Sequence, residues 1–313
     1  MKLITICTAM YNERNNVFPL YKELVKIADL YTNKYKFEFL FVNDGSIDDS
    51  LDMVKKLTVT DKRVKYVDLS RNFGKEIAML AGFDHAKGDA IIMMDADLQH
   101  PPEAIPLMIE GWEEGYQDVY GKRVTREGES FFKKTTSMLY YKILGRLSTV
   151  PVLPAVGDFR LLDRKCIDSI TRLRESQRYT KGMYMWIGFR KKEIEFVAQE
   201  RHAGETKWKF KSLIKLAVDG VISDSTTPLR ISLYSGMFIS FISFIYMIYI
   251  LIKTLIFGSS TPGFPTLTIL ILFLSGSQLI SLGVMGGYIG KIYNEVKNRP
   301  PYLIQEYFSQ DDQ

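Results

Sequence analysis

Short apolar runs alternate with segments of helical period through the first third of this 313-residue chain. The strand-like runs cover residues 3–10, 37–42, 64–68 and 90–94, and the helical segments between them cover residues 16–30, 48–57 and 75–86. Such alternation predicts βαβ units, and therefore an α/β domain with a parallel sheet covered by helices on both faces. Ser46-Ile47-Asp48-Asp49 is similar to a capping box and predicts the start of the second helix.

Polar or glycine-rich residues follow each of the four predicted strands. They are Tyr11-Asn12-Glu13, Asn43-Asp44-Gly45-Ser46, Ser70–Lys75 and the cluster that begins at Asp95. Ligands of open α/β sheets bind beyond the carboxyl ends of the strands, so we expect one site at this edge. The chain has no GxGxxG after the first strand and no GxxxxGK[ST] segment, which argues against a dinucleotide dehydrogenase and a P-loop NTPase.

The segment Asp95-Ala96-Asp97 ends the fourth predicted strand. Aspartates two residues apart repel each other unless a cation neutralises them. A divalent cation that bridges a diphosphate does this, because the phosphates supply its remaining oxygen ligands. The sequence therefore predicts a metal-assisted nucleotide site, with a solvated Asp-rich turn as the alternative.

Two long stretches without charge lie in the C-terminal part of the chain. Residues 231–252 carry no charge, and the next charged residue after Lys253 is Lys291. As a helix, the first stretch rises roughly 33 Å, enough to cross a bilayer core of about 30 Å. We expect two transmembrane helices, at 231–257 and 266–289, with two buried core helices as the alternative. Arg230 and Lys291 flank them and their loop has no Lys or Arg, so the N-terminal domain is expected to be cytoplasmic, at the inner (plasma) membrane.

The expected domains follow from these features. Residues 1–200 form the cytoplasmic α/β domain, 201–230 an amphipathic juxtamembrane segment, 231–290 the hairpin and 291–313 a cytoplasmic tail, of which residues 298–313 are extended or partly disordered. Residues 201–230 contain six Lys or Arg and three acids, which suits a surface of lipid phosphates. A helix at 210–222 is expected on the membrane face, or else packed on the domain as an ordinary surface helix. Cys7 and Cys166 fit reduced thiols in the cytosol.

Six motifs in order carry a resemblance to a known family. They are Tyr11-Asn12-Glu13, Asn43–Ser46, Ser70–Glu76, Asp95–Glu103, Gly157-Asp158-Phe159-Arg160 and Arg201-x-x-Gly204-Glu205-Thr206-Lys207-Trp208. With the hairpin, the chain resembles the family 2 inverting glycosyltransferases. Within that family it is most similar to the polyprenyl-phosphate glycosyltransferases, which include dolichol-phosphate mannosyltransferase and the bactoprenol glucosyltransferases. The family has Asp-Asp-Gly-Ser where this chain has Asn43 and Asp44, and a proline before Tyr-Asn-Glu where this chain has Thr8-Ala9-Met10.

The resemblance implies a GT-A fold, a Rossmann-like nucleotide-binding domain, with a nucleotide-sugar donor and Mg²⁺ or Mn²⁺. It implies nucleotide-sugar contacts from Tyr11, Asn12, Glu13, Asp44, Lys75, Asp95 and Ala96. It implies metal ligation by Asp95, Asp97 and Gln99, and catalytic roles for Asp95, Asp97 and Asp158. Asp158 would face the reacting centre as orienter or base, unless it is a turn residue that pairs with Arg160.

The implied acceptor is a polyprenyl phosphate, whose negative charge needs cationic partners. The candidates are Arg123, Lys133, Lys134, Arg201 and Lys207. The expected reaction is inverting transfer of glucose from UDP-glucose to undecaprenyl phosphate, for cell-envelope glycan or glycolipid modification. UDP-N-acetylglucosamine, a modified arabinose and GDP-mannose remain open as donors, and a processive polysaccharide synthase and a non-catalytic membrane scaffold remain rival functions. We expect a homo-oligomer, because small residues along the second span permit close packing, and no nucleic-acid partner.

Overall fold

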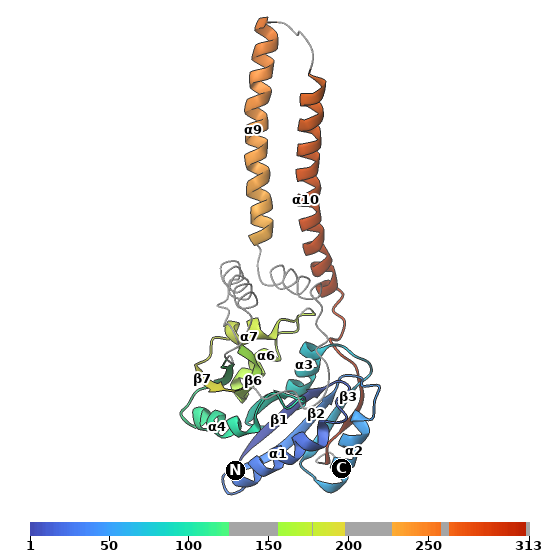
Figure 1. The fold of residues 1–313 in the computed structure, drawn as a ribbon, viewed down its shortest axis with the longest axis vertical. Helices are drawn as coiled ribbons and strands as arrows, with labels where there is room; N and C mark the ends of the chain where they lie inside the picture. The colour runs from blue at the N-terminus through green and yellow to red at the C-terminus, as the bar shows by residue number, and fades with distance from the viewer. Residues whose placement is uncertain (125–155, 177, 198–226, 258–262, 311–313) are drawn as a thin grey trace. The chain divides into compact units, whose positions relative to one another are not determined.

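A computed structural model of the protein describes residues 1–124, 156–176, 178–197, 227–257 and 263–310 (Figure 1). These residues form two compact units. One unit is built on a single sheet and includes the C-terminal segment, and the other consists of two long helices. The predicted juxtamembrane segment at 201–230 lies outside the described residues, except for residues 227–230.

Within the described ranges, the sheet has eight strands in the order β7-β5-β6-β4-β1-β2-β3-β8. The strands are β1 (Lys2–Met10), β2 (Tyr35–Asn43), β3 (Val64–Leu69), β4 (Ala90–Asp95), β5 (Asp118–Arg123), β6 (Val156–Asp163), β7 (Lys191–Phe196) and β8 (Ile304–Phe308). The first four are parallel neighbours, as predicted, whereas β6 and β8 pair antiparallel with β4 and β3. The carboxyl ends of β1, β2 and β4 therefore meet at one edge.

Helices cover both faces of this sheet, which confirms the predicted layering (Figure 1). One face packs against α1 (Val17–Leu30), α2 (Ser50–Thr60) and α4 (Ile105–Glu113), which follows a 3-10 turn at Pro102–Ala104. The other face packs against α3 (Lys75–His85), α6 (Arg164–Ile170) and α7 (Thr180–Trp186). Because both faces are covered, the central strands are apolar runs rather than alternating ones.

The predicted capping box at Ser46 is wrong. Helix α2 begins at Ser50 after the N-cap Asp49, whose side chain makes no capping hydrogen bond. Asp48 Oδ1 instead accepts a hydrogen bond from the Ser50 N–H at 3.0 Å, and the Ser46 hydroxyl accepts one from the Asn12 N–H at 2.9 Å. The serine that resembled a helix cap therefore ties two loops of the sheet edge together.

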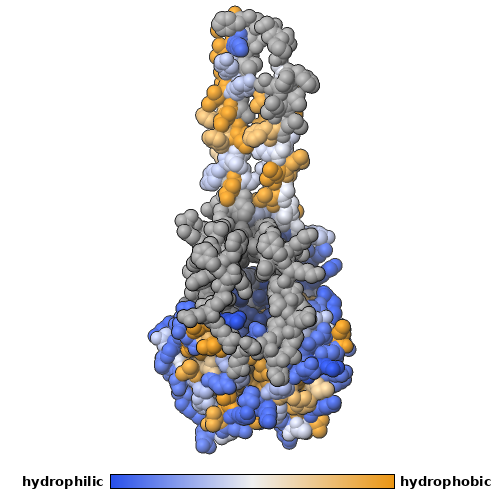
Figure 2. Space-filling model, viewed as in Figure 1, coloured by the Kyte–Doolittle hydropathy of each residue, from blue (hydrophilic) through white to orange (hydrophobic). Residues whose placement is uncertain are grey.

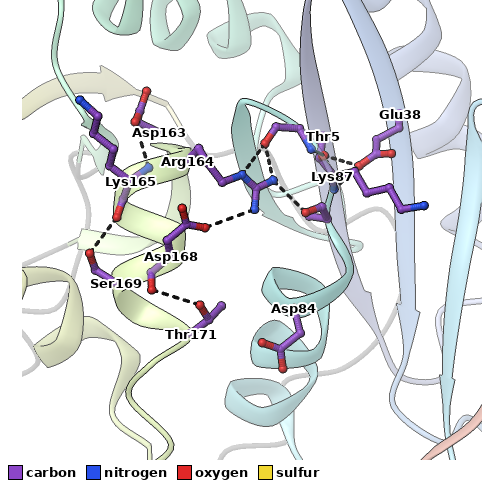
Figure 3. A network of polar contacts seen from close by, with 12 residues as sticks. Thr5, Glu38, Asp84, Lys87, Asp163, Arg164, Lys165, Asp168, Ser169 and Thr171 are labelled. Atoms are coloured by element: carbon purple, nitrogen blue, oxygen red, sulfur yellow. Dashed lines mark hydrogen bonds and ion pairs between the residues drawn. The ribbon is translucent and has the colours of Figure 1, made fainter.

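The loop between α3 and β4 is fixed by a polar network at the edge opposite the predicted site (Figure 3). Arg164 donates from Nε to the Gly88 carbonyl at 2.9 Å and from Nη2 to the Ala86 carbonyl at 2.8 Å. Gly88 N–H donates to the Thr5 hydroxyl at 2.9 Å, and that hydroxyl also contacts Glu38. These contacts fix where β4 begins, and the ladder with β1 then fixes where it ends.

The C-terminal tail contains a strand at residues 304–308, which agrees with the predicted extended tail and leaves no disorder at these residues. Strand β8 pairs with β3, and the Leu303 carbonyl accepts from the Ser70 N–H at 2.9 Å. Glu306 accepts from the Tyr66 hydroxyl at 2.6 Å and pairs with Lys55 Nζ at 2.5 Å. This strand covers the edge of β3, which would otherwise leave its backbone groups unpaired.

The second unit consists of α9 (Thr227–Phe257) and α10 (Phe264–Val296), which contact each other. Hydrophobic residues run along their described parts (Figure 2). Both predicted helices are present. The further prediction that they cross a membrane is not supported, since none of the helices, within the residues described, is long and apolar enough to do so.

Candidate active site

The four polar segments predicted at the sheet edge are neighbours in the structure. Met10 is level with Asn43, and Ala9 is level with Asp95, so the ends of β1, β2 and β4 are side by side. Asn43 is likewise level with Asp68 on β3. The parallel register alone therefore gathers the chemistry-bearing residues at one edge, as the sequence predicted.

Asn12 joins the first of these segments to the second. Its backbone has φ +57°, its N–H donates to the Ser46 hydroxyl at 2.9 Å, and its side-chain oxygen accepts from the Ile47 N–H at 2.9 Å. Glu13 accepts from the Asn16 side-chain amide at 2.6 Å, and Tyr11 is 37% exposed. Asn12 therefore links two loops of the sheet edge, a structural role that was not predicted. Its predicted contact with the nucleotide stays a prediction.

Asp44 holds the loop that leads into α3. Its two carboxylate oxygens accept hydrogen bonds from the Phe73 N–H at 2.7 Å and the Gly74 N–H at 3.0 Å. Burial raises the pKa of this carboxyl group, although the two N–H donors and Arg71 oppose the shift. The predicted nucleotide contact at Asp44 stays a prediction, and the structure adds an anchoring role.

Asn43 stands where the family has the first aspartate of Asp-Asp-Gly-Ser, and its contacts give a physical reason for the difference. Its side-chain amide donates to Asp68 Oδ1 at 2.7 Å, and both residues are buried. An aspartate at position 43 would place a second carboxylate against Asp68 without a proton between them, and like charges at this distance repel strongly. The amide therefore matches Asp68, a residue that the sequence did not single out.

Lys75 lies between two of the predicted catalytic carboxylates. Its ammonium is 2.6 Å from Asp95 Oδ1 and 2.8 Å from Asp158 Oδ2. Asp158 comes from β6, which pairs with β4, so neighbouring strands deliver both acids. The predicted alternative that Asp158 pairs with Arg160 is wrong, because Arg160 pairs with the buried Asp118 at 3.0 Å.

These ion pairs determine the charge of the site. Burial would raise the pKa of Asp158, but Lys75, Lys181 and Arg160 outweigh it, so the pKa of that carboxyl group is lowered. Burial would lower the pKa of Lys75, but Asp95 and Asp158 outweigh it and raise that pKa. Asp158 and Lys75 are therefore both charged near neutral pH. Glu76, which belongs to the Ser70–Glu76 motif but had no predicted role, accepts from the Thr180 N–H at 3.0 Å, and burial raises the pKa of its carboxyl group.

The Asp95–His100 loop is shaped by its own hydrogen bonds. Leu98 has φ +60°, and Asp97 Oδ1 accepts from the Gln99 N–H at 3.1 Å. His100 Nδ1 lies 3.2 Å from the Asp95 backbone nitrogen, and its ring stacks on Phe159 with 4.8 Å between centroids. Burial lowers the pKa of His100, which favours the neutral ring that accepts this hydrogen bond. His100 belongs to the Asp95–Glu103 motif, but no role was predicted for it.

The carboxylates of this loop fit a divalent cation. The ammonium of Lys75 between Asp95 and Asp158 shows that these acids hold positive charge. Among the residues that the structure describes, no group of three or more His, Cys, Asp or Glu side chains could hold a metal. Mg²⁺ commonly takes only one or two carboxylates and completes its shell with phosphate and water, so Asp95 and Asp97 suffice for a metal brought with a nucleotide.

The structure does not describe every predicted phosphate-binding residue. Arg123 is exposed at the end of β5. Lys133, Lys134, Arg201 and Lys207 lie outside the described residues. Of the other predicted site residues, Ala96 is buried behind the loop, and Lys75, Asp95 and Asp158 are in direct contact.

Comparison with known proteins identifies the family of this chain. Residues 5–171 match the family model for glycosyl transferase family 2. The chain is 42% identical over 303 residues to an SfII prophage-derived bactoprenol glucosyl transferase of Shigella flexneri, covering 97% of each protein. It is 40% identical over 302 residues to a prophage bactoprenol glucosyl transferase homolog of Escherichia coli K12, covering 96% of this chain and 98% of that protein. The crystal structure of mannosyl-3-phosphoglycerate synthase from Rubrobacter xylanophilus is 15% identical, with a TM-score of 0.48 over 70% of this chain and 72% of that one.

The layered sheet is an open α/β sheet, a class in which ligands bind beyond the carboxyl ends of the strands, and the acids described above lie at those ends. The chain belongs to glycosyl transferase family 2 and is a glycosyltransferase. The predicted family, enzyme class and GT-A fold are thereby confirmed.

Proposed function

We propose that this glycosyltransferase moves glucose from UDP-glucose to undecaprenyl phosphate with inversion at the anomeric carbon. An oxygen of the acceptor phosphate forms the new bond to C1 while the bond from C1 to the UDP diphosphate breaks, and UDP leaves with the electron pair. The acceptor oxygen is already anionic near neutral pH, so no base has to remove a proton. Relatives that cover nearly the whole chain and are named bactoprenol glucosyl transferases support this acceptor and sugar.

The contact of Lys75 with Asp95 and Asp158 is the observation that carries the proposal, because it places acids and a cation at the sheet edge where a diphosphate would bind. Asp95, Asp97 and Gln99 would hold Mg²⁺ or Mn²⁺, which when bound offsets the charge growing on the leaving diphosphate. Tyr11, Glu13 and Asp44 would face the nucleotide. Asp158 would face the acceptor side, as a carboxylate that orients rather than a base, because its pKa is lowered.

The acceptor is a membrane lipid, so we place the reaction at the inner face of the cytoplasmic membrane. Arg123 would contribute positive charge toward the lipid phosphate or the donor diphosphate, since it is exposed at the end of β5. A processive synthase would add many sugars to one acceptor, whereas this proposal expects one sugar on each lipid.

The test is transfer of radiolabelled sugar to undecaprenyl phosphate in lipid vesicles. UDP-glucose, UDP-N-acetylglucosamine and GDP-mannose are compared as donors, and mass spectrometry counts the sugars on each lipid. We expect a singly glucosylated lipid from UDP-glucose. If the protein binds UDP but no donor yields a lipid-linked sugar, the proposed acceptor is rejected.

A further inference from the structure

Two acids of the site share one ammonium group. Asp158 is buried with 6% of its surface exposed, and its Oδ2 lies 2.8 Å from Lys75 Nζ. Asp95 Oδ1 lies 2.6 Å from the same nitrogen. Neighbouring strands hold the two carboxylates in place, so without this cation they would repel each other at close range. Lys75 is the counter-ion that neutralises this repulsion in the absence of a ligand.

The cation is carried by the most exposed side chain of this group. Its side chain is 46% exposed, whereas that of Asp158 is 8% exposed. The backbone before Lys75 is fixed, because the Phe73 and Gly74 N–H groups bind Asp44. Lysine has a flexible four-carbon arm, so its ammonium can change partners while the start of α3 stays where it is.

We propose that Lys75 competes with the divalent cation for Asp95, so that metal binds together with the nucleotide and not ahead of it. This inference rests on the proposed function, because it assumes that the metal accompanies a nucleoside diphosphate. The ammonium occupies an oxygen that the metal is expected to use. When the diphosphate arrives, its negative charge attracts both cations, and Lys75 exchanges Asp95 for a phosphate oxygen.

The size of the competition follows from Coulomb's law. A single positive charge about 5 Å from a divalent cation disfavours its binding by at least about tenfold, even with the full dielectric screening of water. Water is the appropriate limit because the lysine is nearly half exposed. Removing the charge should therefore raise the affinity for free metal by that factor or more.

The experiment measures Mn²⁺ binding to the full-length protein by electron paramagnetic resonance, without nucleotide and with UDP. Lys75→Gln removes the charge, and Lys75→Arg keeps it. Lys34→Gln is the matched control, because Lys34 also pairs with a carboxylate, Glu113 at 2.6 Å, at the amino end of β2 on the opposite edge of the sheet. We expect Lys75→Gln to bind free Mn²⁺ at least about tenfold more tightly than the wild type, and the other two variants to match the wild type.

Equal or weaker binding of free Mn²⁺ by Lys75→Gln would overturn the inference. If that variant does not fold, Lys75→Met, which also removes the charge, takes its place in the same comparison. Tight Mn²⁺ binding by the wild type without UDP would by itself exclude a competing lysine. Failure of the proposed function would look different. The wild type would then bind no UDP even with Mn²⁺, while the comparison of variants with Mn²⁺ alone would still stand.

Discussion

Gly45→Ala tests whether the proposed nucleotide site depends on the close approach of the loops that contain Gly45 and Arg71. Gly45 has φ +63°, a conformation that costs alanine about 1 kcal/mol. An added β-carbon would lie 2.4 Å from the Arg71 carbonyl carbon and 2.6 Å from the Asn72 nitrogen. Both are backbone atoms, so the loop must move by about 1 Å, and overpacking of this kind costs about 1–3 kcal/mol. The expected loss of stability is about 2–4 kcal/mol.

Gly115→Ala is the matched control for this prediction. Gly115 has φ +90°, but an added β-carbon there meets nothing within 4 Å. Gly115→Ala should therefore lose only the free energy of unfolding that the left-handed backbone costs alanine, about 1 kcal/mol. Urea unfolding followed by tryptophan fluorescence measures both variants. Calorimetric titration with UDP should show at least about tenfold weaker binding for Gly45→Ala only, because a 1 Å displacement is large for a binding loop. Equal losses of stability in the two variants would refute the argument from close approach.

Three further predictions concern charge at the same edge. Asp97→Ala should abolish sugar transfer without unfolding the protein, and EDTA should stop the wild-type reaction until Mg²⁺ or Mn²⁺ is added; near-normal transfer by the variant in vesicles would reject the metal role. Asn43→Asp should cost about 3 kcal/mol in urea unfolding, because it sets an unpaired buried carboxylate against Asp68. Because the pKa of Asp158 is lowered, its contribution to stability is present above the unfolded pKa of about 3.9 and is lost as pH falls through the lower folded value. Lys75→Gln removes the main opposing charge, so its acid unfolding, followed by circular dichroism, should begin at higher pH; an unchanged acid transition would contradict this.

The sequence predicted the first half of the sheet well, because the signals there are local. Strand β1 begins one residue before its predicted start, and α1 begins one residue after its predicted start. Each apolar run is buried on both faces and each helix between runs has a periodic apolar stripe, so burial and periodicity agree. The polar residues after each run then fall at one edge because parallel strands end together.

Strand β8 could not be predicted in the same way. Its five residues follow two prolines and have no apolar run, and their burial pattern is mostly exposed. Their pairing with β3 depends on contacts with residues more than 200 positions away, such as that of Glu306 with Tyr66. Long-range pairing of this kind leaves little trace in local composition.

The partner of Asp158 was also beyond the reach of sequence reasoning. Arg160 is two residues away and lies on the same face of a strand, so pairing between them was a reasonable expectation. In the sheet, however, Arg160 is level with Tyr120 of β5, and Asp118 lies diagonally across from it at pairing distance. Cross-strand neighbours compete with neighbours along the chain, and register decides between them.

The charges of the site divide into a fixed set and a movable one. Asp95 and Asp158 end or lie within strands whose positions the ladder sets, so their backbones stay close to each other. Acids held this close need positive charge beside them at all times, while in the proposed reaction a diphosphate and a metal would come and go during each turnover. A half-exposed lysine at the start of a helix meets this requirement, because it can follow the changing charge without moving the sheet. The order in which the cations bind would then depend on Lys75 as much as on the acids that hold them.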